Sequence, residues 1–127
     1  RYHLRDAVTF TGYVDEQEKY RLLGHARALL LPAYYEGFGL PLLEAMWTGT
    51  PIIAARTGSL PEIGGEACLY TDPLDAYRMA QAIASLMDDP SQQKKYREAG
   101  KERVKQFTWK HTADQLMTLC EQVAKVA

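Results

Sequence analysis

Long apolar runs, abundant cysteine and a surplus of one charge are all missing from this sequence of 127 residues. No apolar stretch approaches the roughly 18 residues that a membrane-spanning helix needs. The formal net charge is −1, which gives no reason to expect a nucleic-acid partner. The first six residues are polar, so we expect no secretory signal in them. These absences favour a globular domain that works in the cytoplasm.

The sequence also has few cysteine and histidine residues with which to form a disulfide or bind a metal ion. Cys68 and Cys120 lie far apart in apolar surroundings, and we expect both to be buried thiols in a reducing compartment. The histidines His3, His25 and His111 are isolated, and no group of Cys and His has the spacing of a metal site. We therefore expect neither a metal nor a cofactor in this domain.

Apolar segments alternate with amphipathic ones along the chain, which predicts an α/β domain with a mostly parallel sheet flanked by helices. The predicted strands are residues 7–10, 28–31, 51–55 and 68–70. The predicted helices start near residue 15 and cover residues 41–48, 72–87, 90–106 and 109–125. Polar side chains that can cap these helices precede the last three of them, at Asp72, Asp89 and Thr108.

The most informative stretch is residues 34–49, which follows the apolar segment 28–31 directly. It begins as a loop that contains Gly37 and Gly39, and it continues as a helix. The first N–H groups of a helix have no partner within it and carry a partial positive charge. Glycines leave the backbone open to a close approach, so this stretch predicts a cradle for phosphate groups.

Two acidic residues flank the predicted cradle. Glu36 precedes it and Glu44 lies in the helix, with seven residues between them. Carboxylates repel phosphate, but they accept hydrogen bonds well from hydroxyl groups. The combination is therefore suited to a sugar nucleotide, which carries both phosphates and hydroxyls.

This pattern resembles the signature of retaining glycosyltransferases with two Rossmann-like domains, the GT-B type. That group includes bacterial mannosyltransferases, sucrose synthase and glycogen synthase. The segments that carry the resemblance are residues 8–14, 36–44, 49–54, 60–63 and 69–73. The resemblance implies that residues 1–127 are the C-terminal, nucleotide-sugar-binding domain of such an enzyme, without the family's first two strands of that domain and without its N-terminal acceptor domain.

The resemblance also implies roles for individual residues. Glu36 is expected to face the transferred sugar near the developing oxocarbenium charge, and not to act as a covalent nucleophile. Glu44 is expected to accept hydrogen bonds from the ribose hydroxyls of the donor. The other expected donor-binding groups are Tyr13 and Val14 near the base, and the N–H groups of Gly37, Phe38, Gly39 and Leu40 at the diphosphate.

The implied reaction transfers a sugar from a nucleoside diphosphate donor to a glycan or a lipid-linked sugar, with retention of the anomeric configuration. Two alternatives remain open: a non-catalytic nucleotide-binding or assembly module, and a sugar-nucleotide epimerase of the same architecture. The Arg and Lys with which the family balances the diphosphate cannot be placed in this sequence. We therefore expect the chain alone to bind nucleotide poorly and to be inactive.

Two surfaces of the expected domain could contact a partner: one edge of the sheet and a basic helix. The sheet edge beside residues 28–31 is expected to be covered either by residues 7–10 or by another chain, which would make a homodimer. The basic run over residues 94–105 is expected to be a solvated face. Its alternative is a peripheral contact with the inner surface of a membrane, which we expect only in a longer parent protein.

Overall fold

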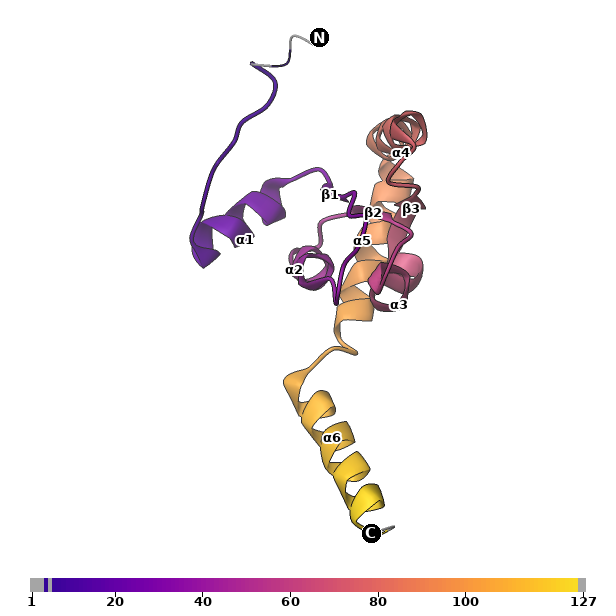
Figure 1. Cartoon of the computed structure of the whole chain (residues 1–127). Coiled ribbons are helices and arrows are strands. Elements are labelled where there is room, and N and C mark those ends of the chain that lie inside the picture. Colours follow the sequence, from indigo (N-terminus) through magenta and orange to yellow (C-terminus); the bar gives the residue numbers. More distant parts are fainter. Residues whose placement is uncertain (1–3, 5, 126–127) are drawn as a thin grey trace.

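A parallel sheet of three strands lies at the centre of the computed structural model, which describes residues 4 and 6–125 (Figure 1). Its strand order is β1-β2-β3, and Leu30 of β1 lies opposite Ile53 of β2, which in turn lies opposite Leu69 of β3. The strands are β1 (Leu29–Leu31), β2 (Ile52–Ala55) and β3 (Cys68–Thr71). Because all three strands are parallel, their carboxyl ends meet at one edge of the sheet, where the connecting loops gather.

Helices flank this sheet and confirm the predicted α/β class. In Figure 1, α1 lies beyond the β1 edge of the sheet and α4 lies beside β3. Helix α2 packs against both α1 and α5. The helices are α1 (Glu16–His25), α2 (Leu40–Thr48), α3 (Leu60–Gly64), α4 (Ala76–Asp88), α5 (Pro90–Val104) and α6 (Trp109–Ala124), with a 3₁₀ turn η1 (Gly65–Ala67).

The core lies where β2 meets α2 and α5. All four residues of β2 are buried, as expected for the middle strand of a parallel sheet that is covered on both faces. Leu42, Ala45 and Met46 of α2 are also buried. A Cβ atom at Gly100 of α5 would lie 3.2 Å from Cγ of Met46, so the glycine lets the two helices approach closely. This packing fixes the position of α2 and of the loop that leads into it.

Two of the three predicted helix caps are confirmed, and one is wrong. The side chains of Asp89 and Thr108 accept hydrogen bonds from first-turn N–H groups of α5 and α6. Asp72 instead accepts from the N–H of Leu74 at 2.8 Å, and its carbonyl accepts from the N–H of Asp75 at 3.1 Å. These bonds close a turn, so α4 begins later than predicted, with Asp75 as its cap.

The predicted strand over residues 7–10 is wrong. Residues 8–10 are not part of any sheet in the described part of the chain, and Phe10 is 93% exposed. An apolar segment becomes a strand only where a neighbouring strand supplies the hydrogen-bond ladder, and β1 does not supply it here. One edge of β1 is therefore open within the described residues, and Leu30 is 40% exposed.

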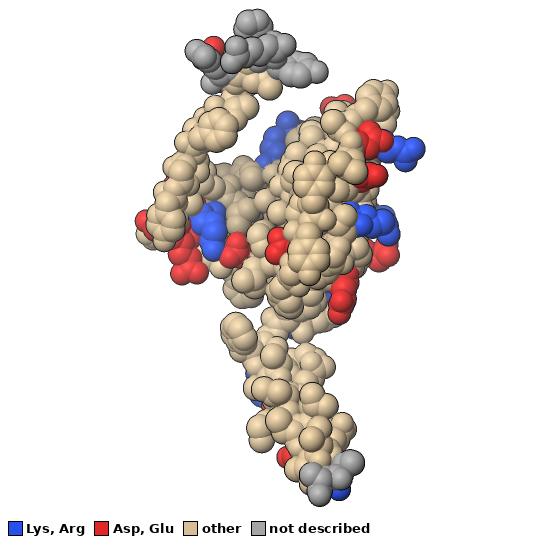
Figure 2. Space-filling model, in the orientation of Figure 1, with Lys and Arg blue, Asp and Glu red and all other residues tan. Residues whose placement is uncertain are grey.

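Helix α6 leads away from the rest of the molecule (Figure 1), and none of its residues is buried. Figure 2 shows mostly uncharged surface on the side of α6 that faces the viewer. The prediction that Cys120 is buried is therefore wrong, because the apolar side of α6 has no cover, whereas Cys68 in β3 is buried as predicted. Within the described residues, the helices are too short or too polar to cross a membrane.

The two thiols should differ sharply in reactivity. Burial raises the pKa of Cys68 to about 12, so almost no thiolate forms there at pH 8, whereas Cys120 is exposed. We expect a disulfide reagent at pH 8 to label one thiol of the native chain quickly, Cys120→Ser to remove that reaction, and denaturant to reveal the second thiol. Rapid labelling of Cys120→Ser in the native state would show that Cys68 is accessible.

Candidate functional site

The loops that follow β1 and β2 are bound to each other at the carboxyl edge of the sheet. In the β2 loop, Oγ1 of Thr57 donates to the carbonyl of Ala33 at 2.8 Å, and Oγ of Ser59 donates to the carbonyl of Glu36 at 2.9 Å. Between them, Gly58 has a φ of +53°, and a Cβ atom there would lie 2.7 Å from the carbonyl oxygen of Glu36. The backbone at Glu36 is thus held in place from β2, independently of what binds to it.

Gly39 shapes the entry into α2. It is the residue before the helix, its φ is +99°, and its position requires that it carry no side chain. A Cβ atom there would lie 2.9 Å from Cδ1 of Leu42 and 3.0 Å from Cδ2 of Leu60, both in the core. Gly37 differs, because its φ is not positive and a Cβ atom there would meet nothing within 4 Å. The first glycine therefore leaves space above the backbone, and the second makes the turn possible.

Four successive N–H groups remain available at this turn. Within the described part of the chain, no group accepts a hydrogen bond from the N–H of Gly37, Phe38, Gly39 or Leu40. The next residue, Pro41, has no N–H at all. Unpaired N–H groups at the start of a helix carry its partial positive charge and bind anions. The predicted cradle is thus present as a local geometry.

Glu36 lies on the loop that leads to these N–H groups. Glu36 is partly buried, and its Cγ lies 3.8 Å from the position that a Cβ atom on Gly39 would occupy. Its carboxylate takes part in none of the hydrogen bonds or ion pairs found among the described residues. The backbone of Glu36 is fixed, and its carboxylate remains available for a ligand.

Glu44 is paired with a lysine that the sequence analysis did not find. Nζ of Lys19 in α1 lies 2.6 Å from Oε1 of Glu44 in α2. This hydrogen bond is the main reason why the pKa of Lys19 is raised. Glu44 lies between apolar neighbours in the sequence, so its charge favours a partner. The identity of that partner depends on how α1 packs on α2, and the two residues are 25 positions apart.

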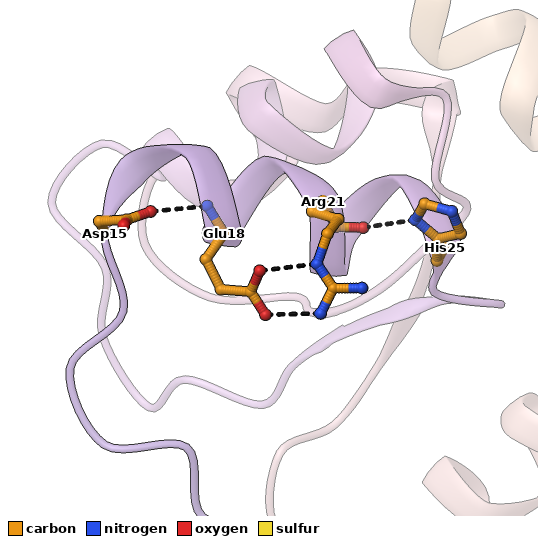
Figure 3. A network of polar contacts seen from close by, with 4 residues as sticks. All are labelled: Asp15, Glu18, Arg21 and His25. Atoms are coloured by element: carbon orange, nitrogen blue, oxygen red, sulfur yellow. Dashed lines mark hydrogen bonds and ion pairs between the residues drawn. The ribbon is translucent and has the colours of Figure 1, made fainter.

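The polar contacts in Figure 3 lie within helix α1, which carries Lys19, and at its cap; Leu23 of this helix packs against the core. Asp15 accepts from the N–H of Glu18 at 2.8 Å, and Arg21 donates two hydrogen bonds of 2.6 Å to the Glu18 carboxylate, which lowers the pKa of Glu18. Nδ1 of His25 lies 2.8 Å from the carbonyl oxygen of Arg21. Because Arg21 is occupied by Glu18, Lys19 is the cation of α1 that reaches α2.

Tyr13 and Val14 were predicted to lie near the nucleotide base of the donor. Tyr13 is 97% exposed and Val14 is partly buried, directly before α1, so the structure does not pack Tyr13 against the loop after β1. Their proposed contact with a nucleotide base stays a prediction.

Phe38 is 47% exposed and lines a cavity of about 540 Å³ together with Phe107 and Trp109. Arg103 lines the same cavity and ties α5 to α3 by donating to the carbonyls of Glu62 and Ile63 at 2.6 and 3.0 Å, respectively.

The histidines do not gather at the site. His25 is bound to its own helix, as Figure 3 shows, and His111 is exposed on α6. His3 lies outside the described residues. No group of three or more His, Cys, Asp or Glu side chains within residues 4 and 6–125 is arranged to hold a metal ion.

Several known proteins are similar to this chain in sequence. The model of the family described as Glycosyl transferases group 1 matches residues 1–103. The O-antigen chain mannosyltransferase B of Escherichia coli is 36% identical over 108 residues, which are 85% of this chain and 28% of that protein. A glycogen synthase of Mycobacterium tuberculosis is 36% identical over 110 residues, which are 84% of this chain and 27% of that protein.

A solved structure has the same fold. The sucrose-phosphate synthase of Thermosynechococcus elongatus superposes with a TM-score of 0.85 at 35% identity, over 98% of this chain and 32% of that one. This similarity confirms the α/β fold and the resemblance to part of a GT-B enzyme. The chain spans less than a third of the length of the relatives described here.

The two glycines of the cradle should respond differently to alanine. Gly39→Ala must place a Cβ against Leu42 and Leu60 at a positive φ, and we expect it to lower the free energy of unfolding by about 1–3 kcal/mol. Gly37→Ala is the matched control, and we expect it to change that free energy by less than about 0.5 kcal/mol. Urea denaturation followed by circular dichroism measures both. Equal effects of the two substitutions would contradict the role given to Gly39.

Proposed function

This chain belongs to the glycosyl transferases group 1 family, and from that premise we propose that it is the donor-binding region of a glycosyltransferase. The proposed reaction moves a sugar from a nucleoside diphosphate donor to an acceptor with retention of the anomeric configuration. The observation that carries this proposal is the row of unpaired N–H groups at the start of α2, flanked by the carboxylates of Glu36 and Glu44. The names of the matched relatives, a mannosyltransferase and a glycogen synthase among them, support it.

The diphosphate of the donor would lie against the N–H groups of residues 37–40. Each N–H donates to a phosphate oxygen, and the aligned peptide dipoles of α2 favour the negative charge. Gly37 leaves room for the phosphate to reach the backbone, since nothing lies within 4 Å of the position of its Cβ. The hydrogen bonds from the β2 loop hold the backbone at Glu36 before the donor arrives, so little ordering is left to the binding step.

The ribose of the donor would lie against Glu44. Oε1 of Glu44 is taken by Lys19, which leaves Oε2 to accept a hydrogen bond from a ribose hydroxyl. The side chain of Glu44 is 23% exposed, so part of it is open to solvent. We assign Lys19 a positioning role, because its bond to Oε1 limits the rotation of the carboxylate.

The transferred sugar would lie against Glu36, whose carboxylate is free of other bonds within the described residues. In the proposed step, the bond between the anomeric carbon and the phosphate oxygen breaks and its electrons leave with the diphosphate. The acceptor hydroxyl forms the new bond on the same face, and its proton passes to the departing phosphate oxygen. Glu36 stabilises the positive charge that develops on the sugar and forms no covalent bond with it.

The isolated chain should bind donor weakly and should not transfer sugar. Two phosphates in the cradle would lie near Glu36 and Glu44, which repel them. Lys19 already pairs with Glu44, and Arg103, which lines a cavity with Phe38, already donates to two backbone carbonyls of α3. A helix terminus contributes only about 0.3–1 kcal/mol at an exposed site.

Titration of the chain with a nucleoside diphosphate, followed by amide NMR, tests the proposed donor site. We expect a dissociation constant near or above about 1 mM, with the largest shifts at Gly37, Phe38, Gly39 and Leu40. Saturable shifts confined to another surface would refute the cradle. Micromolar affinity, or sugar transfer by the chain alone, would refute the expectation that the isolated region is insufficient.

The ribose carboxylate can be tested by substitution. Glu44→Gln replaces a charge-assisted hydrogen bond of about 1.5–3 kcal/mol by a neutral one of about 0.5–1.5 kcal/mol, so we expect nucleotide affinity to fall about fivefold to tenfold. Lys19→Met should weaken binding by a smaller factor, because the carboxylate remains but is no longer held. Glu98→Gln, at an exposed position of α5, is the matched control and should bind like the original chain. Unchanged affinity of Glu44→Gln would remove Glu44 from the ribose role.

A further inference from the structure

A cavity of about 1040 Å³ opens beside the carboxyl ends of β2 and β3 and the start of α4. None of the residues to which a donor role was given above lines this cavity. It nevertheless adjoins the donor site, because Thr57 lines it and also donates a hydrogen bond to Ala33 in the loop after β1. Two binding regions therefore share the loop after β2.

An arginine without a carboxylate partner lies at this cavity. The guanidinium of Arg56 lies over the ring of Tyr70, 4.9 Å from its centroid, and it forms none of the ion pairs found within the described residues. This cation–π contact positions the guanidinium of Arg56 beside the ring and leaves its N–H groups without a carboxylate partner among the described residues. These donors are available to the oxygen atoms of a ligand.

Acceptor groups face the same space. Asp72 and Asp75 each use one oxygen to accept from a backbone N–H, of Leu74 and Arg78 respectively. Nε of Arg78 lies 3.4 Å from the second oxygen of Asp75. The remaining lone pairs of both carboxylates can accept from ligand hydroxyls, whereas they would repel a phosphate or a carboxylate.

The cavity also contains an exposed aromatic ring and a polar atom without a partner. Tyr77 of α4 is 73% exposed. Thr71, at the end of β3, is only 8% exposed, and its Oγ1 has no hydrogen-bond partner within the described residues. A buried hydroxyl without a partner is costly and rare in folded proteins. The protein thus leaves both polar and apolar binding capacity unused in one place.

We propose that this cavity binds an uncharged saccharide, at a site separate from the proposed donor site. Sugar hydroxyls both donate and accept, which matches the carboxylates of Asp72 and Asp75 and the guanidinium of Arg56. The apolar face of a pyranose ring matches the exposed ring of Tyr77. A nucleotide or a sugar phosphate fits less well, because the arginines and aspartates that line the cavity balance in charge and leave no net positive charge for a phosphate.

Amide NMR of the full 127-residue chain with neutral oligosaccharides tests this inference. The probes are maltoheptaose and an α-linked mannotriose, and glucose 1-phosphate is the charged comparison. We expect saturable shifts at Arg56, Thr71 and Tyr77 with at least one neutral probe, and weaker binding of glucose 1-phosphate. Absence of saturable shifts with both neutral probes, or stronger binding of glucose 1-phosphate, would overturn the proposal.

Substitutions separate the cavity from the donor site. Tyr77→Ala and Arg56→Met should each weaken saccharide binding about tenfold or more, while Tyr77→Phe should retain it. Arg97→Met, at an exposed position of α5, is the matched control and should leave binding unchanged. Circular dichroism checks that each variant is folded, and retained affinity in both Tyr77→Ala and Arg56→Met would overturn the assignment.

A third titration distinguishes this inference from the proposed function. Glu44→Gln should weaken nucleotide binding and leave saccharide binding intact, and Tyr77→Ala should do the reverse. If saccharide binds and nucleotide does not, the saccharide site stands and the donor site fails. If a nucleoside diphosphate displaces the saccharide and shifts Tyr77, the cavity belongs to the donor and the inference is overturned.

Discussion

The hydrogen bonds between the β2 loop and the β1 loop are the constraint on which the candidate site depends. Ser59 and Thr57 hold the carbonyls of Glu36 and Ala33, and Gly58 lets the two backbones approach. With those carbonyls occupied, the N–H groups of the turn into α2 have no acceptor among the described residues. A loop that closed on itself would consume the groups that an anion needs. The site therefore depends on the β2 loop, whose side chains bind the carbonyls of the β1 loop and leave the N–H groups of the turn available to a ligand.

Electrostatics then decides what kind of ligand suits this turn. The helix start favours negative charge, and the carboxylates of Glu36 and Glu44 oppose it. Lys19 offsets one of them through a bond of 2.6 Å that also joins α1 to α2. A ligand that presents only phosphate gains from the N–H groups and loses to the carboxylates. A ligand that also presents hydroxyls gains from both, which is why the local charges favour a sugar nucleotide over inorganic phosphate.

Local sequence patterns predicted most helices and strands correctly. The errors arose where the structure depends on contacts between residues far apart in the sequence. The strands near residues 28–31, 51–55 and 68–70 are apolar throughout, as is typical of strands in a parallel sheet. Residues 7–10 are also apolar except for Thr9, but a strand exists only if a neighbouring strand pairs with it. The same holds for Cys120, since an apolar helix side indicates a need for cover without supplying it. The apolar neighbours of Glu44 in the sequence indicate that it favours a charged partner. That this partner is Lys19 could not be predicted, because it depends on how α1 packs on α2.

The open edge of β1 has a consequence for the behaviour of the chain at high concentration. Free strand edges recruit other edges and start aggregation when they are long and flat. This edge is three residues long, so it offers only a short ladder to a second sheet. The apolar side of α6 exposes Leu116, Met117, Leu119 and Val123 along its length. Concentration-dependent association of the isolated chain is thus favoured through helix contacts, which are reversible, more than through the growth of β-structured aggregates.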